Sequence, residues 1–213
     1  MKTICLLFLS ATAIFSQPFS AGFKGGVPLT DFIHAVNAQN FTSTATTNRY
    51  IVGVTGEARL PFGLGVEVDV LYRHFGYGST STISGITTTS TITDTTSGAW
   101  EFPILAKYRF KGPIIHPFIS AGVAWDKLSG LSQTVTRIVA DVSHTTTSSN
   151  PFELRKDTTR GFVLGAGFDV KALLIHIAPE VRFTRWGSRH FIDPNGLFDS
   201  KQNQAEFLVG ITF

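Results

Sequence analysis

The sequence predicts an all-β protein, an eight-stranded, antiparallel, up-and-down transmembrane β-barrel. Three observations favour this fold class. Eight segments alternate apolar with polar or small residues, and the side chains of a strand point to opposite faces with the same period of two. The connections between these segments are alternately short and long. Charged residues make up only 15% of the chain, against roughly 25% in typical soluble domains.

The strand candidates each reach the roughly 9–11 residues that a tilted transmembrane strand needs. In chain order they are Phe19–Thr30, Tyr50–Leu60, Leu64–Tyr77, Ala99–Phe110, Ile114–Lys127, Arg160–Lys171, Leu173–Trp186 and Asn203–Phe213. The four long connections are Asp31–Arg49, Gly78–Gly98, Leu128–Thr159 and Gly187–Gln202. Transmembrane barrels have short periplasmic turns and long extracellular loops. We therefore expect the long connections to be extracellular.

The first residues predict a secretory signal peptide over residues 1–20, with a cleavage point between residues 16 and 21. Lys2 precedes a short apolar run from Ile4 to Phe15, and small residues follow. This run is too short to span a bilayer as a helix. Residues 21–213 are expected to form one barrel domain. The single cysteine, Cys5, lies in the signal peptide, so the mature chain is expected to form no disulfide.

The segment from Ala99 to Phe110 shows most clearly how the side chains face. Its even-numbered positions are apolar or aromatic, whereas Glu101, Lys107 and Arg109 lie on the other face. The interior of an eight-stranded barrel is only wide enough for side chains to fill. It could not hold nearly all the large apolar residues of eight strands. The apolar face is therefore expected to meet lipid, and the charged face to line the lumen.

By this parity the lumen contains a network of charges of both signs. Its expected members are Glu57, Arg59, Glu67, Asp69, Arg73, Glu101, Lys107, Arg109, Asp126, Asp169, Lys171, Glu180, Arg182 and Glu206. Paired carboxylates also occur in general acid–base sites. The structural interpretation is favoured, because a narrow barrel fills its interior with charges that must find partners. A continuous water channel is not expected at this strand number.

Aromatic residues are expected in belts at both rims of the barrel, where they meet the membrane interfaces. The extracellular belt is expected to contain Tyr50, Tyr72, Trp100, Trp125 and Trp186. The last strand has an unbroken apolar face that ends on an aromatic residue, and it resembles the assembly signal of bacterial outer-membrane barrels. The residues of this signal are Phe207, Val209, Ile211 and Phe213.

Prolines and a run of hydroxyl residues add two local expectations. Pro103, Pro117 and Pro179 lie inside strand candidates and predict local bulges, because proline cannot donate to the ladder. The connection at residues 79–97 has 14 Ser or Thr among 19 residues. Such β-branched residues favour extended structure, so strands are expected to protrude above the membrane here and in the third long connection. An adhesive surface and a hydrophilic cap are equally compatible with this pattern.

Two stretches, Trp100–Phe110 (WEFPILAKYRF) and Ala178–Trp186 (APEVRFTRW), resemble the outer-membrane protein β-barrel domain family, which includes the small OmpA-like and OmpX-like barrels. The resemblance implies an eight-stranded barrel in the outer membrane of a Gram-negative bacterium. The partners it implies are outer-membrane lipid and lipopolysaccharide, the barrel assembly machinery and periplasmic chaperones. It implies no particular activity, because the family hosts adhesins, stabilisers and small pores.

The leading functional hypothesis is a non-enzymatic structural or surface-interaction role that displays Ser/Thr-rich extracellular loops to an unidentified ligand. A narrow porin-like conduit is the first alternative. A lipid A-modifying enzyme centred on the outward-facing His74 is the second, although the adjacent strand offers no clear serine nucleophile. The six histidines lack metal-ligand spacing, so no metal or cofactor is expected. A net charge of +3 without basic clusters gives no support for nucleic-acid binding.

Deleting Phe213 is expected to impair insertion, because the deletion removes the last residue of the apolar face and the aromatic of the assembly signal. The measurement is the amount of heat-modifiable barrel in outer-membrane fractions. Normal amounts of the folded barrel in the deletion variant would contradict this assignment.

Overall fold

A computed structural model of the protein describes residues 19–35, 40–85, 87–172, 175–192 and 198–213. The predicted signal peptide lies outside these residues, apart from Phe19 and Ser20, which begin the first strand. No helix in the described part of the chain is long and apolar enough to cross a membrane.

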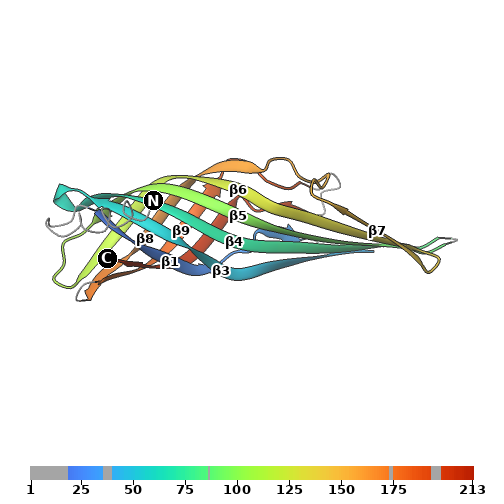
Figure 1. The fold of residues 1–213 in the computed structure, drawn as a ribbon, viewed down its shortest axis with the longest axis horizontal. Coiled ribbons are helices and arrows are strands. Elements are labelled where there is room, and N and C mark those ends of the chain that lie inside the picture. Colours follow the sequence, from blue (N-terminus) through green and yellow to red (C-terminus); the bar gives the residue numbers. More distant parts are fainter. Residues whose placement is uncertain (1–18, 36–39, 86, 173–174, 193–197) are drawn as a thin grey trace, which may run out of the picture.

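Eight long strands form the closed barrel that the sequence predicts (Figure 1). They are β1 (Phe19–Pro28), β3 (Phe41–Arg59), β4 (Leu64–Ile83), β5 (Thr89–Arg109), β6 (Ile115–Val139), β8 (Thr158–Ala172), β9 (Ile175–Trp186) and β11 (Asn203–Thr212). Every pairing is antiparallel, and the β5–β6 pairing closes the sheet. The first and last strands pair with each other, with Phe23 opposite Ile211. The predicted fold class is confirmed.

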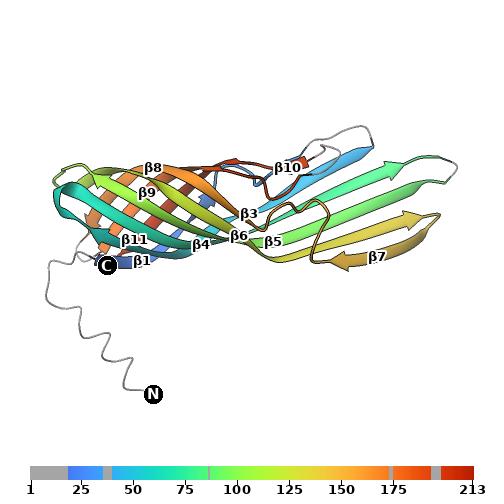
Figure 2. The same cartoon turned by 90° about the horizontal axis from the view of Figure 1, so that it is seen from above.

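Four strands continue past the barrel into a long flat sheet, which we call the sheet extension (Figure 2). It consists of the ends of β3, β4, β5 and β6 that face the long connections, together with β7 (Val142–Ser148), which pairs with β6. Much of the two Thr-rich connections is therefore strand, and the loop boundaries expected at residues 78–98 and 128–159 are wrong. Threonine and valine favour this outcome because β-branched side chains fit an extended backbone.

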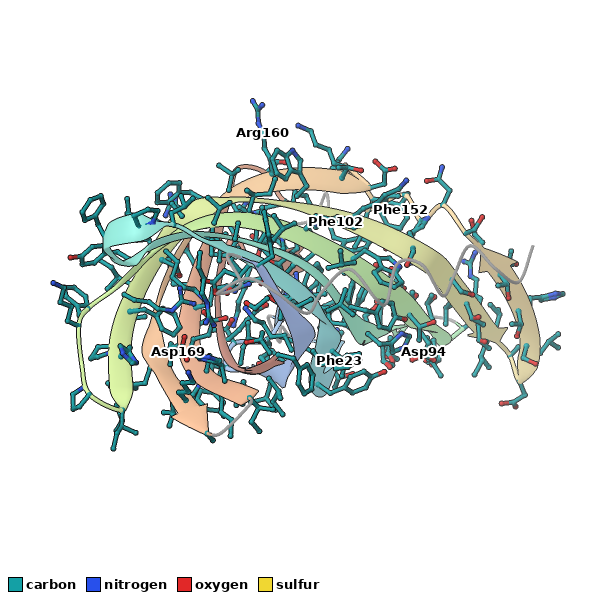
Figure 3. The ribbon with its side chains drawn as sticks, turned by 60° about the vertical axis from the view of Figure 1, so that its left-hand side comes forward. Phe23, Asp94, Phe102, Phe152, Arg160 and Asp169 are labelled. Carbon is teal, nitrogen blue, oxygen red and sulfur yellow. The ribbon has the colours of Figure 1, made fainter. Side chains whose placement is uncertain are left out.

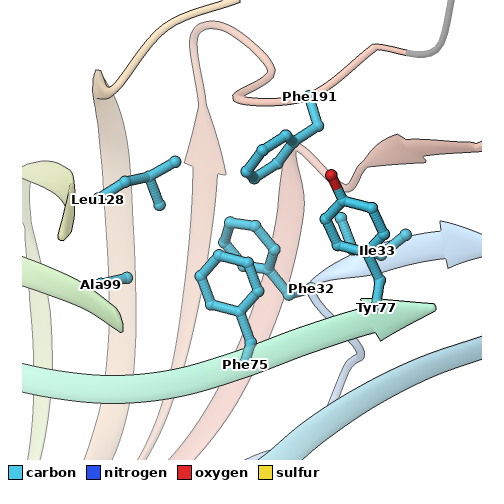
Figure 4. Packing of buried hydrophobic residues seen from close by; sticks show 7 residues of the cluster. All are labelled: Phe32, Ile33, Phe75, Tyr77, Ala99, Leu128 and Phe191. Carbon is cyan, nitrogen blue, oxygen red and sulfur yellow. The ribbon is translucent and has the colours of Figure 1, made fainter. Parts of the chain in front are cut away.

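A small second sheet lies over the same end of the barrel. It pairs β2 (Ile33–Ala35) with β10 (Phe198–Ser200), which come from the first and last long connections. Beneath it is a hydrophobic cluster that we call the cap (Figure 4), and Phe32 stacks on Phe75 there with 3.9 Å between ring centroids. The cap consists of Phe32, Ile33, Phe75, Tyr77, Ala99, Leu128 and Phe191. Apolar packing thus covers the mouth of the barrel that faces the long connections.

The opposite end of the barrel has tight turns, as the sequence predicts. A single 3₁₀ turn, η1 (Pro61–Gly63), joins β3 to β4, and Phe62 within it has a positive φ of 66°. Its side chain is 91% exposed. Phe110 and Phe213 are also exposed at this end. The asymmetry between short turns and long connections matches that of transmembrane barrels.

The prediction of bulges at the three prolines is wrong. Each proline pairs in continuous register with one of its two neighbouring strands. The register shifts lie elsewhere, between Thr47 and Ile51 and between Thr96 and Gly98. The physical reason is that each strand residue directs its N–H to one neighbour only. At Pro103 the β4–β5 ladder skips two pairs and resumes in the same register. The barrel therefore loses local pairing at Pro103 without shifting the chain.

The expected position of Trp186 in the aromatic belt is also wrong. Trp186 is 2% exposed and packs inside the barrel against Leu105, Ala124 and Val163. The period of two continues unbroken along β9, so Trp186 shares the inward face of Arg182 and Thr184, both fully buried. A missing Cβ at Gly161 leaves room for the ring, because a Cβ there would lie 2.7 Å from the indole.

Candidate functional site

Inward side chains of the barrel form three tiers of charges along its axis. The lower tier lies near the short turns, on β3, β5, β8 and β9. Arg109 Nε donates to Asp169 Oδ2 at 2.8 Å, and the Arg109 guanidinium also pairs with Glu57. His176 Nδ1 lies 2.8 Å from Asp169 Oδ1. Arg59, with its side chain 29% exposed, lies 3.8 Å from Glu57. This tier fills the short-turn end of the lumen with charges of both signs.

The middle tier balances three cations against three carboxylates. Lys24 Nζ contacts Glu67 Oε1 at 2.6 Å, Glu180 Oε1 at 2.9 Å and Asp69 Oδ2 at 3.1 Å. Arg182 Nη2 reaches the same three carboxylates at 2.8 to 3.2 Å. Lys107 pairs with Glu67, and its Nζ lies 3.6 Å from Glu57 in the lower tier. The two tiers are therefore one connected network.

The upper tier connects the network to the cap. Arg73 bonds Asp126 Oδ2 at 3.0 Å, Gln204 Oε1 at 2.7 Å and Glu206 Oε1 at 3.1 Å. His190 Nε2 lies 3.2 Å from Asp126 Oδ2. The Arg73 guanidinium also lies 5.1 Å from the centroid of the Phe32 ring. The polar network thus contacts the apolar cap through Arg73 and Phe32.

The network is buried from water. Arg182, Asp69 and Asp126 all have exposed fractions of 0%. Burying a charge is costly unless opposite charges and hydrogen bonds surround it. The middle tier meets this condition, because each of its cations contacts at least two carboxylates. Such an arrangement fills and rigidifies the lumen, whereas an open passage would leave water-exposed charges.

The structure brings together most of the lumen residues that the sequence predicts, with one difference. Lys171 was expected in the lumen, but it is exposed at the end of β8. Glu101 is buried in the lumen as expected, nearer the cap than Lys107 and Arg109, and opposite Asp126 in the β5–β6 ladder. Its Oε1 is buried and has no hydrogen-bond partner among the described residues.

Sequence reasoning missed four residues of the network. One is His176, which lies on the inward face of β9 with Glu180 and Arg182. Lys24 was overlooked although it alternates with the outward Phe23 on β1, so strand parity alone could have found it. Gln204 is on the inward face of β11, two residues from Glu206, and the same parity applies. His190 lies in the last long connection, beyond any strand, and no sequence pattern places it beside Asp126.

The outward face of the barrel carries the apolar and aromatic residues. Tyr50, Trp100 and Trp125 are each 40% to 43% exposed, and Tyr72 packs its ring 4.9 Å from that of Trp100. In the last strand Phe207, Ile211 and Phe213 are exposed and Val209 is half-buried. Figure 3 shows Phe23 and Phe102 on this outer surface, whereas Asp169 lies inside. An apolar exterior around a charged interior is the reverse of a soluble barrel.

Other reactive chemistry finds little support in the described part of the chain. No group of three or more His, Cys, Asp or Glu side chains in it could hold a metal ion. His74 is half-buried and pairs in the β4–β5 ladder with Gly98, which offers no hydroxyl. The neighbouring Ser97 faces inward and donates to the backbone carbonyls of Gly98 and Ser129.

Residues 15–187 match the family described as outer membrane protein beta-barrel domain. The chain belongs to this family. The resemblance that the sequence suggested is therefore confirmed, and the protein is an outer-membrane β-barrel. No curated protein matches the chain.

Solved outer-membrane barrels resemble the chain at very low sequence identity. OprG of Pseudomonas aeruginosa is 14% identical, with 91% of this chain and 92% of that chain covered and a TM-score of 0.50. The N-terminal β-barrel domain of Pseudomonas aeruginosa OprF is 12% identical, covering 92% and 98%, with a TM-score of 0.39. At such identity the likeness to OprG concerns the fold alone.

Replacing Lys24 by methionine is expected to destabilise the outer-membrane barrel by about 3–5 kcal/mol, the usual cost of removing one partner from a buried ion pair. The change leaves three buried carboxylates with one cation fewer. Urea unfolding in phospholipid vesicles measures the free energy of unfolding. Lys111→Met, at an exposed site near the short turns, is the matched control and should change it by less than about 0.5 kcal/mol. Equal losses in both variants would contradict the role of Lys24.

Proposed function

We propose that the protein is a non-catalytic structural barrel of the outer membrane that holds the sheet extension outside the cell for surface interactions. The filled lumen is the observation that carries this proposal. Charged side chains with no solvent exposure occupy its middle, and Phe191 in the cap is also 0% exposed. A conducting pathway would need water contact at every level along the axis.

The sheet extension supports the surface-interaction part of the proposal. Strand β7 is exposed at every residue, and within the described ranges it pairs with β6 alone, so its outer edge offers backbone groups to a partner. Thr134 faces Thr147 and Thr136 faces Thr145, with hydroxyl oxygens 3.4 and 3.1 Å apart. An exposed edge strand can add a strand from a partner. A hydrophilic cover for the barrel mouth would not require such a long projection.

The lumen part of the proposal is tested by electrical recording. Purified protein in planar lipid bilayers is expected to show no stable unitary conductance, because the charge network and the cap block the axis. A general porin reconstituted in the same bilayers provides the positive control. Steady unitary currents from the protein would instead support the narrow-conduit alternative.

The location of the sheet extension is tested by proteolysis of intact cells. The β6–β7 hairpin turns at Ala140 and Asp141, which have φ of 48° and 64° and are exposed. A protease of broad specificity added to intact cells is expected to cleave there and to leave the barrel strands intact, as mass spectrometry of the fragments would show. Cleavage only after the outer membrane is permeabilised would place the extension in the periplasm and contradict the proposal.

A further inference from the structure

Among the side chains that the structure describes, positive charges on the outer surface of the barrel gather on one side at the level of the aromatic belt. Lys127 on β6, Arg160 on β8 and Arg185 on β9 are exposed on adjacent strands, and Lys156 precedes β8. At the same level, neighbouring β4 and β5 present Tyr72 and Trp100 instead. Figure 3 shows Arg160 projecting away from the barrel wall. We call these four residues the basic cluster.

The strand register places the members of the basic cluster next to one another. Arg160 is opposite Trp125, and Arg185 is opposite Phe162, two residues further along β8. The N–H of Gly187 donates to the Arg160 carbonyl at 2.8 Å, so a residue without a side chain, directly after β9, lies beside Arg160. Side chains at directly opposite and diagonal positions of an antiparallel pair are within reach of each other. The guanidinium groups therefore flank an open space.

Two adjoining hollows occupy this space, with volumes of about 440 and 480 Å³. Trp125, Arg160 and Gly187 line both of them. The first also reaches Lys156 and the hydroxyls of Thr158 and Ser188, and the second also reaches Phe162 and Arg185. One hollow is therefore lined by cations and hydroxyls, and the other combines cations with apolar walls.

The charges of the basic cluster are not neutralised by the protein. In the described part of the chain, none of its four residues forms an ion pair, and Arg185 donates only to the neutral Asn203, at 3.2 Å. Asp157, next to Lys156 in the sequence, is exposed and forms no ion pair within the described residues. Asp126, next to Lys127, faces the lumen and pairs with Arg73. Cations on the lipid-facing surface of a barrel are unfavourable unless they lie at an interface or meet anions. The cluster lies at the aromatic belt, which is the level of the lipid headgroups, so an anionic headgroup would meet these charges there.

We propose that the basic cluster binds the phosphate groups of the outer-leaflet glycolipid, lipopolysaccharide. Arginine holds phosphate with paired, charge-assisted hydrogen bonds. The apolar surface directly below, formed by Val123, Leu164 and Phe183, would contact the acyl chains of the same molecule. This combination distinguishes a phosphorylated lipid from a free anion. The inference rests on the proposed orientation, with the sheet extension outside the cell, because lipopolysaccharide lies in the outer leaflet. Proteolysis of intact cells tests that orientation, whereas lipid A binding to the purified protein tests the cluster itself.

Binding of bis-phosphorylated lipid A to the full-length mature protein in lipopolysaccharide-free detergent micelles tests the proposal. Native mass spectrometry gives the dissociation constant for the wild type and for R160Q/R185Q. The double variant should bind roughly tenfold more weakly or worse, since it loses two charge-assisted contacts. The control K111Q/K171Q removes the same charge at the short-turn end and should bind within about twofold of the wild type. Heat-modifiable mobility verifies that each variant is folded.

Two further ligands distinguish binding of the whole lipid from binding of phosphate alone. Dephosphorylated lipid A should bind the wild type as weakly as bis-phosphorylated lipid A binds R160Q/R185Q, and inorganic phosphate alone should not compete at matched concentration. If R160Q/R185Q does not fold, K127Q/K156Q tests the same cluster at two more exposed positions. Unchanged affinity in the folded cluster variant, an equal loss in K111Q/K171Q, or equal binding of dephosphorylated lipid A would each overturn the proposal. Tight binding of inorganic phosphate would also overturn it, in favour of a free-anion site.

Discussion

The ion pairs that cross the lumen are the interaction on which the rest of the structure depends. Backbone hydrogen bonds connect each strand only to its two neighbours, but the charges connect strands that lie further apart. Lys24 ties β1 to β4 and β9, and Arg73 ties β4 to β6 and β11. In a low-dielectric interior each of these charges would be costly alone. The barrel is therefore stabilised from inside by buried cations and carboxylates that neutralise one another.

This internal arrangement leaves the exterior free to meet lipid. A membrane-spanning sheet must close because no water is available to satisfy an open edge, and the β5–β6 and β1–β11 pairings achieve that closure. Above the barrel the requirement ends. There β3, β4, β5 and β6 continue as an open sheet to which β7 is added, with β3 and β7 at its two edges. The change from a closed to an open sheet separates the part of the protein that anchors from the part that can bind.

Strand parity predicted the lumen well and failed where a second effect intervened. Glu57, Glu67 and Arg182 were expected inside and lie in the network. Trp186 follows the same parity and faces inward with the other even-numbered residues of β9. Its aromatic character alone does not place it in the outer belt. The prolines were misjudged because a missing N–H disturbs one ladder and leaves the other in register. The protruding strands could be anticipated from their β-branched residues, although their length could not.

The sequence by itself determined the fold class, the number of barrel strands, the facing of most side chains and the family. Those features follow from local alternation and connection length, which a linear chain displays directly. Only the tertiary structure decided which charges pair, that His190 and Phe191 return over the barrel mouth, and that Lys127, Arg160 and Arg185 meet on one side. These relations depend on the stagger between strands and on long connections without a repeating pattern. The alternation of side chains within a single strand determines neither the stagger nor the path of those connections.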